Sequence, residues 1–583
     1  MRLRLLSLLG AGLVAACAPT RTVPETAPPK TDSTPAADAE GPLKHRPAAT
    51  SPDITAEDLM TRLYIFADDS MQGREAGTAG NVKGTNYIAA EARRMGLTPA
   101  GENGTFFQTV PLIIRATDST SRLEVAGASL TVNRDFLPLP LFPSFLPYGS
   151  QLQAENPTAL YAGRVGDSLT PAILAQGAGK LVVFGPARDK DGKPTGKLFI
   201  HGPPPAVPGA AGVAFATLDL VPKSELAFLR QPQVVVATTV DERRTIPLGL
   251  LISSAVARQL FGASVDSLKP GTPGTPVGGQ IKFTGTATAT PARNVVALLP
   301  GSDPRLRGEY VALGAHNDHL GVGADVVDHD SLRLFNTLAR PEGDNQSAKP
   351  LTSQQSGAIQ RQLDRLRGVR PPRPDSIFNG ADDDGSGSVT VLEIAEALAR
   401  GREKPNRSVL FVWHTAEEKG LYGSQWFTDH PTVPRDSIVA QLNMDMVGRG
   451  RASDVEGGGP NAVGLVGSRR LSTELGDLIE RVNRRRQPAF EIDYRYDANG
   501  HPDNIYCRSD HYMYARYGIP IAFFSTGLHR DYHEVTDEPQ YIDYEHMARV
   551  GDFVRDVALA VANRDHRPVV DHPKPDPNAP CNQ

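Results

Sequence analysis

Short apolar runs and amphipathic stretches alternate along the C-terminal half of the chain, and together they predict a layered fold. Runs with the length and composition of buried strands lie at residues 295–299, 310–315, 408–413, 438–443 and 520–524. Amphipathic patterns with a helical period cover residues 388–400, 473–484 and 544–563. Strands that alternate with helices predict an α/β fold, with a mixed and mainly parallel sheet sandwiched by helices.

The N-terminal half begins with helical patterns and then changes to a β-rich one. Helices are expected at residues 55–67, where Thr55 and Asp58 form a capping-box arrangement, and at residues 82–95. From residue 144 to residue 277, short β-like runs are separated by glycine and proline turns. This change predicts a β-rich module inserted into the fold.

The first 52 residues have the features of an export signal followed by a tether. Residues 1–17 contain two arginines, an apolar stretch too short to span a bilayer, and then Cys17, as in a signal peptide. Residues 14–17 resemble the bacterial lipoprotein box, so Cys17 is expected to carry lipid and to anchor the protein in the cell envelope, on the periplasmic or outer-membrane side. The alternative is a secreted protein with Cys17 incidental. Residues 18–52 are rich in proline and poor in large apolar side chains, which predicts an extended tether.

The other end of the chain, residues 566–583, is also rich in proline and is expected to be loose. Cys507 and Cys581 remain once Cys17 is assigned to lipid. An exported compartment permits a disulfide between them, but a reduced pair fits the sequence equally well. The pairing therefore stays open at the level of sequence.

Composition and charge narrow the classes of function. The chain has 583 residues, 40% of them hydrophobic and 22% charged, which excludes a disordered chain, a collagen and a disulfide-stapled miniprotein. The formal net charge is -5, without the excess of basic residues that is typical of nucleic-acid-binding proteins, so nucleic acid is not an expected partner. Neither the composition nor the net charge determines the oligomeric state.

Acidic and histidine clusters follow four of the predicted strands, and a fifth cluster opens a predicted helix. The clusters are His316 to Asp318, His414 to Glu418, Asn443 to Asp445, Tyr532 to His533, and the acidic turn Asp382 to Asp384. A lone cluster of this kind is more often an ordinary polar surface or turn. Together they are informative, because the carboxyl ends of parallel strands meet at one edge of a sheet, where ligands bind.

The residue types in these clusters indicate the chemistry. Imidazole and carboxylate groups without cysteine predict a site for Zn²⁺ or a similar divalent ion. The acidic turn lacks the alternate spacing of a calcium-binding EF-hand loop. The sequence also lacks the HExxH, GxSxG and Walker patterns, which weakens one-zinc HExxH peptidase, serine hydrolase and P-loop interpretations.

The order of the clusters resembles peptidase family M28, a family of zinc aminopeptidases. The matching signature is His-x-Asp, an Asp in an acidic turn beside Gly-Ser-Gly, Glu-Glu, Asn-x-Asp-Met and a late Tyr-His. The resemblance covers residues 294–562 and includes the loop from Met71 to Thr78. It implies a zinc-exopeptidase type of fold, into which a protease-associated (PA) domain is commonly inserted. Residues 144–277 resemble such a domain, although much more weakly than the clusters match.

On this resemblance the chain divides into six parts. They are a lipoprotein signal peptide (1–17), a tether (18–52), the N-terminal part of a catalytic domain (53–143), a PA-like insert (144–277), the main M28-like catalytic domain (278–565) and a proline-rich tail (566–583). The expected activity is removal of N-terminal residues from peptides.

The resemblance also implies two zinc ions per chain and the residues that hold them. His316 and Asp445 would bind one zinc, Glu418 and His533 would bind the other, and Asp383 would bridge the two. Two metals held close together lower the pKa of a shared water and stabilise the charge that develops during hydrolysis.

Three further residues receive catalytic roles from the resemblance. Glu417 would be the general base that activates the metal-bridging water. Asp318 would hold the second nitrogen of the His316 ring and fix its tautomer. Tyr532 would polarise the scissile carbonyl.

Residues 323–378 separate Asp318 from Asp383 and carry many polar residues with few strand signals. We expect an extra loop or a helical excursion near residues 359–366, over the rim of the site, where it could restrict access. Residues 509–511 and His529 lie near the last ligand in sequence. They are either pocket-lining or simply structural.

Other functions remain open. A carboxypeptidase on the same fold is one, because nothing in the sequence identifies a pocket for a free amine or a free carboxylate. Relatives that cyclise N-terminal glutamine use one zinc, so the retained His316 disfavours them. A catalytically inactive peptide-binding lipoprotein is disfavoured because every inferred ligand and Glu417 are present.

Overall fold

The computed structural model describes residues 40–139, 151–196, 207–237, 247–402, 404–577, 579 and 581–583. The expected signal peptide, Cys17 and most of the expected tether lie outside these residues. The chain separates into residues 1–37 and residues 38–583, and every described residue belongs to the second unit. Within it, no described helix has both the length and the apolar character needed to cross a membrane.

The main sheet has nine strands, and all five strands predicted in the C-terminal half belong to it. The order is β1-β16-β20-β17-β21-β24-β22-β23, with β2 paired to β16. The central strands β20, β17, β21 and β24 run parallel to one another. The bounds are β1 (Thr98–Pro99), β2 (Phe107–Val110), β16 (Ala292–Leu299), β17 (Tyr310–His316), β20 (Ser408–His414), β21 (Ile438–Met444), β22 (Ala462–Val466), β23 (Glu491–Asp493) and β24 (Ile521–Ser525).

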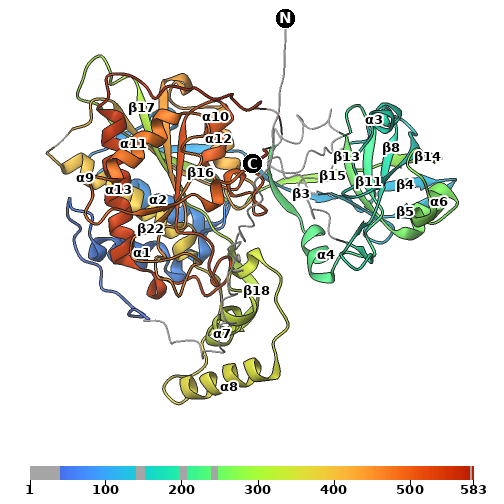
Figure 1. Cartoon of the computed structure of the whole chain (residues 1–583), viewed down its shortest axis with the longest axis horizontal. Helices are drawn as coiled ribbons and strands as arrows, with labels where there is room; N and C mark the ends of the chain where they lie inside the picture. The colour runs from blue at the N-terminus through green and yellow to red at the C-terminus, as the bar shows by residue number, and fades with distance from the viewer. Residues whose placement is uncertain are drawn as a thin grey trace, which may run out of the picture. The chain divides into compact units, whose positions relative to one another are not determined.

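Helices cover both faces of this sheet (Figure 1). One face packs against α1 (Ala56–Phe66), α2 (Ala79–Arg94), α9 (Gly387–Arg400), α11 (Thr473–Asn483) and α13 (Tyr544–Ala562). The other packs against α10 (Tyr422–Asp429) and α12 (His511–Ala515). The predicted mixed α/β fold is confirmed.

The alternation of strand side chains explains why the central strands are apolar throughout. In β20, Val409, Phe411 and Trp413 face the first layer of helices, whereas Leu410 and Val412 face the second. All five are fully buried. A strand that is buried on both faces cannot show the apolar-polar alternation of a half-exposed strand.

A second, eight-stranded sheet forms the β-rich part, in the order β5-β4-β14-β7-β8-β11-β13-β6. It extends beyond the expected limits of 144 and 277, because β4, β5 and β6 precede residue 144 and β14 ends at Gln280. The bounds are β4 (Arg122–Val125), β5 (Ala128–Thr131), β6 (Phe136–Pro138), β7 (Thr158–Arg164), β8 (Leu181–Gly185), β11 (Gly212–Phe215), β13 (Leu248–Ile252) and β14 (Pro273–Gln280). Its helices are α3 (Pro171–Gly177), α4 (Lys223–Leu229) and α6 (Ser254–Phe261).

Three further strands form a sheet of their own in the order β12-β3-β15. Their bounds are β3 (Leu112–Thr117), β12 (Gln233–Val236) and β15 (Phe283–Ala287). Leu112 from β3 and Val235 and Val236 from β12 share a hydrophobic cluster with Ala416 and Tyr422 of the main domain. Thus β12, although it falls within the expected β-rich segment, lies outside the eight-stranded sheet.

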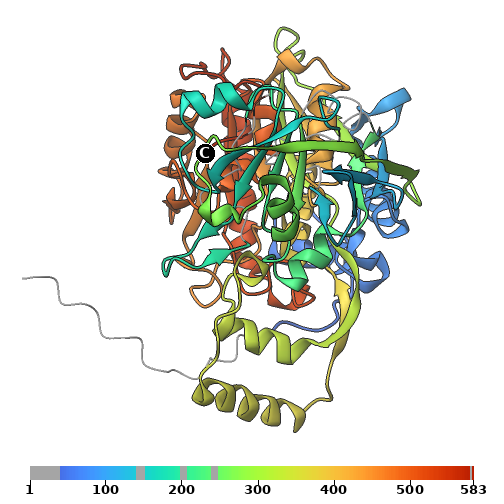
Figure 2. The same cartoon turned by 90° about the vertical axis from the view of Figure 1, so that its right-hand side faces the viewer.

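Residues 321–378 form an arm, drawn in yellow-green in Figures 1 and 2. An antiparallel ribbon of β18 (Gly321–Asp328) and β19 (Pro374–Phe378) carries two helices, α7 (His329–Ala339) and α8 (Ser353–Arg367). The helix expected at residues 359–366 lies within α8, which has no fully buried residue. The ribbon was not predicted, because β18 is interrupted by glycine and acidic residues.

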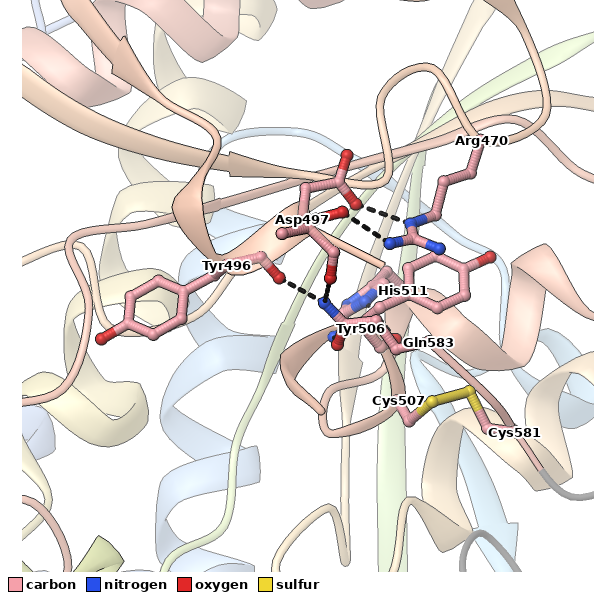
Figure 3. The surroundings of a disulfide bond; sticks show 9 residues. Arg470, Tyr496, Asp497, Tyr506, Cys507, His511, Cys581 and Gln583 are labelled. Carbon is pink, nitrogen blue, oxygen red and sulfur yellow. Dashed lines mark hydrogen bonds and ion pairs between the residues drawn. A yellow bond between two sulfur atoms is a disulfide. The ribbon is translucent and has the colours of Figure 1, made fainter. Parts of the chain in front are cut away.

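The C-terminal tail lacks helices and strands among its described residues, but it is not loose. Cys581 forms a disulfide with Cys507, with a Cα–Cα distance of 5.7 Å, which resolves the open question of their pairing. Figure 3 shows the side-chain amide of Gln583 beside this bond, where it donates to the carbonyl oxygens of Tyr496 and Ala498. The tail is therefore pinned to the loop that precedes α12.

Candidate metal centre and active site

Parallel strands bring the predicted site residues to one edge of the main sheet. His316 ends β17, Glu417 and Glu418 follow β20, and Asp445 follows β21. His533 lies in the loop after β24, and Asp383 lies in the turn before α9. Because β20, β17, β21 and β24 are neighbours that run in the same direction, the residues after them converge on a single place.

The side chains of this group lie at metal-ligand spacing around Asp383. One carboxylate oxygen of Asp383 lies 3.0 Å from His316 Nε2, and the other lies 3.2 Å from His533 Nε2. Glu418 Oε2 lies 3.1 Å from His533 Nε2, and Asp445 Oδ1 lies 3.8 Å from His316 Nε2. The structure thus brings together all five predicted ligands, with Asp383 between the two histidines.

The chemistry of this group fits cations. His316 Nε2 is buried and makes no hydrogen bond with a described residue, although it faces the carboxylates of Asp383 and Asp445. Three of the residue groups that could hold a metal draw on this cluster. Several buried carboxylates facing imidazole nitrogens are stable only with a compensating positive charge, which a divalent ion or protonated histidines would supply.

Burial and the close approach of carboxylates and imidazoles also shift the pKa values of these groups. Burial disfavours ionisation of Asp383, but the rings of His316 and His533 outweigh it and hold the pKa of Asp383 well below its usual range. Burial likewise disfavours a charged His316, but the carboxylates of Glu417 and Asp445 raise its pKa well above the usual value. Burial, together with the neighbouring carboxylates of Glu418 and Asp445, raises the pKa of Glu417 well above its usual range.

Asp318 differs from its expected role. Its carboxylate is 3.8 Å from His316 Nδ1, too far for a hydrogen bond, and the Nδ1 atom instead lies 3.0 Å from the backbone oxygen of Asp318. The carboxylate accepts a hydrogen bond of 3.1 Å from the backbone N–H of Glu417. Burial raises the pKa of Asp318 to about 7. Asp318 therefore holds the His316 ring through its main chain and the Glu417 loop through its side chain.

Tyr532 stacks on the ring of His533, with centroids 3.9 Å apart. Its hydroxyl accepts a hydrogen bond of 3.0 Å from Arg508 Nη2. Tyr532 lines the same pocket as Glu417 and Asp445. The structure therefore places Tyr532 where a bound peptide could reach its hydroxyl.

His319 belongs to the site and was missed by the sequence analysis. Its Nδ1 atom lies 2.6 Å from Glu418 Oε1, and its ring is fully buried beside that of His533. His319, Asp383 and Glu418 form one of the groups with metal-ligand spacing. A signal was present, because His319 follows directly after the His316 to Asp318 motif at a strand end.

The residues that the sequence left undecided divide into two kinds. Ser509 Oγ donates to Asp445 Oδ2 at 2.7 Å, so Ser509 supports a predicted ligand. Asp510 Oδ2 lies 3.3 Å from Nδ1 of His414, which is not among the predicted ligands, and burial lowers the pKa of His511 to about 3. His529 faces Asp382 at 3.0 Å. Asp510, His511 and His529 are therefore structural.

A pocket opens beside the cluster, and most of its wall is apolar. The lining includes Asp383, Glu417 and Asp445 from the cluster, together with Arg508 and Tyr532. Its apolar side chains are those of Met446, Val466, Ile505, Phe523 and Leu528. Such a pocket is suited to an apolar side chain whose neighbouring polar atoms reach the carboxylates.

Comparison with known proteins gives a family. Residues 294–558 match the family described as "Peptidase family M28". "Leucine aminopeptidase 1" of Paracoccidioides brasiliensis (strain Pb03) is 33% identical over 180 residues, which cover 29% of this chain and 43% of that protein. "Leucine aminopeptidase 1" of Ajellomyces capsulatus (strain NAm1 / WU24) is 33% identical over 205 residues, 33% of this chain and 48% of that protein. The chain thus spans less than half the length of these curated relatives.

Among solved structures, "Aminopeptidase from Aneurinibacillus sp. strain AM-1" has a TM-score of 0.44 and 16% identity, and the match covers 90% of this chain and 97% of that chain. A zinc aminopeptidase from Bacillus subtilis, BSAP, has a TM-score of 0.43 and 14% identity, with 90% and 99% covered. The sequence match carries the assignment. Residues 294–558 of this chain therefore form a region of the peptidase family M28 type.

Proposed function

We propose that the chain is a two-zinc aminopeptidase that removes N-terminal residues from peptides. The proposal rests on two histidine rings that face the same carboxylate. His316 and His533 each direct Nε2 at a different oxygen of Asp383. A carboxylate in that position is suited to bridge two divalent ions, with Asp445 and Glu418 completing the ligands on either side.

Bound zinc would supply Lewis acidity and a water of lowered pKa. The chain itself supplies the proton acceptor. Glu417 lines the pocket beside Asp383 and Asp445, and its backbone is held by Asp318. Its carboxylate would take the proton from the attacking water and deliver it to the leaving amine.

Tyr532 would donate its hydroxyl hydrogen to the scissile carbonyl oxygen as negative charge develops there. Burial raises the pKa of Tyr532, so the hydroxyl keeps its proton at neutral pH. Arg508 Nη2 donates to the hydroxyl oxygen of Tyr532, so the hydroxyl hydrogen is free to point into the pocket. Arg508 would thereby orient the hydroxyl.

The pocket favours an apolar first residue. Met446, Val466, Ile505, Phe523 and Leu528 provide a surface that matches leucine or phenylalanine better than a short polar side chain. The matched relatives bear the name "Leucine aminopeptidase 1", and 33% identity supports the transfer of that preference as part of this proposal.

We also propose an exported protein anchored by lipid on Cys17, in the cell envelope, with the β-rich sheet as a PA-like domain. The signal-like residues 1–17 support export. The disulfide between Cys507 and Cys581 also supports it, because such bonds persist in oxidising compartments.

A hydrolysis panel tests the proposed activity. Purified protein, loaded with zinc, should release free leucine from Leu-containing peptides with a free N-terminus. N-acetylated versions of the same peptides should stay intact, and a chelator should abolish the reaction until zinc is restored. Metal analysis should give two zinc ions per chain. Release of C-terminal residues from the N-acetylated peptides would instead establish the carboxypeptidase alternative, and no hydrolysis at all would favour a binding protein.

A further inference from the structure

One positively charged side chain lines the pocket beside the candidate metal centre, and its charge has no role in the proposed mechanism. Arg508 is the one arginine or lysine among the described residues that line this pocket. It is half-buried. It lies directly before Ser509, which holds Asp445, and its guanidinium contacts Tyr532, the neighbour of His533. A peptide bound in this pocket would therefore lie beside this guanidinium.

The described partners of Arg508 are all neutral. Nη1 donates to Asn345 Oδ1 at 2.8 Å and to the backbone oxygen of Asp503 at 3.4 Å, while Nη2 donates to the Tyr532 hydroxyl at 3.0 Å. Among the residues that the structure describes, Arg508 has no ion pair with a carboxylate. Its Nε–H and one Nη2–H form no hydrogen bond with them, and a guanidinium edge of this kind binds a carboxylate in a bidentate manner.

Three other buried arginines have their main partners within the protein. Arg62 pairs with Glu393 and Glu396, and Arg449 pairs with Asp531 and Asp537. Arg74 has no such acid, but it donates to three backbone carbonyl oxygens and lies outside the pocket. Arg508 thus differs from these arginines in having both spare donors and access to the pocket.

Two acids lie near Arg508 without pairing to it. The carboxylate of Asp503 accepts a hydrogen bond from Asn345 Nδ2 at 3.3 Å, and Glu417 belongs to the metal cluster. Burial opposes a charged Arg508, but Tyr532, Asp503 and Glu417 outweigh burial and raise its pKa. Arg508 therefore stays charged throughout the neutral range.

We propose that Arg508 receives a carboxylate of the substrate and is a specificity residue of this site. The inference rests on the proposed peptidase function and defines its substrates more closely. The carboxylate has two sources: the acidic side chain of a first residue, or the free C-terminus of a short peptide. Asn345, which comes from the arm between α7 and α8, orients the guanidinium for this purpose.

Two matched substrate pairs distinguish the sources. Glutamyl-p-nitroanilide and glutaminyl-p-nitroanilide differ only in a side-chain carboxylate, and Leu-Gly and Leu-Gly-amide differ only in a terminal one. For the wild type with zinc, we expect kcat/KM to favour the anionic member of one pair by about tenfold or more, as one charge-assisted hydrogen-bond pair provides. The pair that shows this ratio identifies the source.

The variants assign that ratio to Arg508. Arg508→Met should bring the ratio to near one, while Arg508→Lys, which keeps the charge but loses the bidentate edge, should give an intermediate value. Arg305→Met is the control, because Arg305 is highly exposed and pairs with Asp303. It should leave both ratios unchanged.

Two outcomes would overturn the inference. One is a wild type with neither ratio above about threefold. The other is an Arg508→Met variant in which all four substrates slow by the same factor, as expected if Arg508 only orients Tyr532. Calorimetric binding of the four compounds to the zinc-loaded Glu417→Gln variant measures the same preference without turnover. Failure of the peptidase function and failure of carboxylate recognition are thereby distinguished.

Discussion

The metal centre and the arm contribute to the same site but are stabilised in different ways. The strands behind the centre are fully buried, and their side chains belong to two extensive hydrophobic clusters. The arm has large apolar side chains in α7 and α8, yet none of them is fully buried and none belongs to a described hydrophobic cluster. Packing positions the centre, and the arm reaches it mainly through polar contacts.

Those polar contacts converge on the loop that carries Tyr532 and His533. Arg340 of the arm pairs with Glu534 at 2.7 Å, and the backbone N–H of Asp344 donates to the carbonyl oxygen of Tyr532. Gly343, with φ of 56°, lies so close to Tyr532 that an added Cβ would be 2.4 Å from its backbone oxygen. The difference between the regions is that packing fixes the candidate centre, whereas the arm contacts one wall of it through polar groups.

The largest expected effect is on the chemistry. Glu417→Ala should lower kcat by about a thousandfold or more, because the proton acceptor is lost. Zinc content by atomic emission should stay near that of the wild type, since Glu417 is not among the proposed ligands. Near-normal kcat in this variant would contradict the assignment of Glu417.

The next largest effect is on stability, and the same substitution, leucine to alanine, compares packing in the two regions. Leu410→Ala, at a fully buried position of β20, should lower the free energy of unfolding by about 2–5 kcal/mol. Leu363→Ala, at a partly exposed position of α8, should cost about 1 kcal/mol or less. Chemical denaturation measures both values. Equal losses would show that the arm is packed as tightly as the sheet.

The smallest effect concerns the polar link between the regions. Arg340→Ala removes the partner of Glu534 and should lower kcat several-fold, which corresponds to about 1 kcal/mol. Steady-state kinetics on a Leu-peptide measures it, with the exposed α8 variant Arg361→Ala as control. An unchanged kcat for Arg340→Ala would mean that the arm does not adjust the Tyr532 loop.

Much of the fold was predictable from sequence, because strong physical constraints act at those positions. The central strands are buried on both faces, so their apolar runs were recognisable, and the ligands follow them directly. The structure brings His316, Asp383 and Asp445 together from segments separated by more than sixty residues. Strand order brings His316 and Asp445 together, and the turn before α9 adds Asp383.

Other features depend on contacts that no local pattern encodes. The ribbon of β18 and β19 contains glycine and charged residues and is defined only by pairing across the arm. The interaction of Asp318 with Glu417 depends on a backbone N–H whose direction is set by the turn after β20. Arg508 carries no signal in the sequence, because an arginine in a loop is ordinary until its neighbours are known.

The bond between Cys507 and Cys581 has a further consequence for the integrity of the site. It closes a covalent ring with a sequence separation of 74, and that ring contains Arg508, Ser509, Tyr532 and His533. A protease that cuts one peptide bond inside the ring leaves the two fragments joined, so the cut ends cannot diffuse apart. The wall of the pocket is therefore protected against loss by a single nick, a form of durability that neither burial nor hydrogen bonding provides.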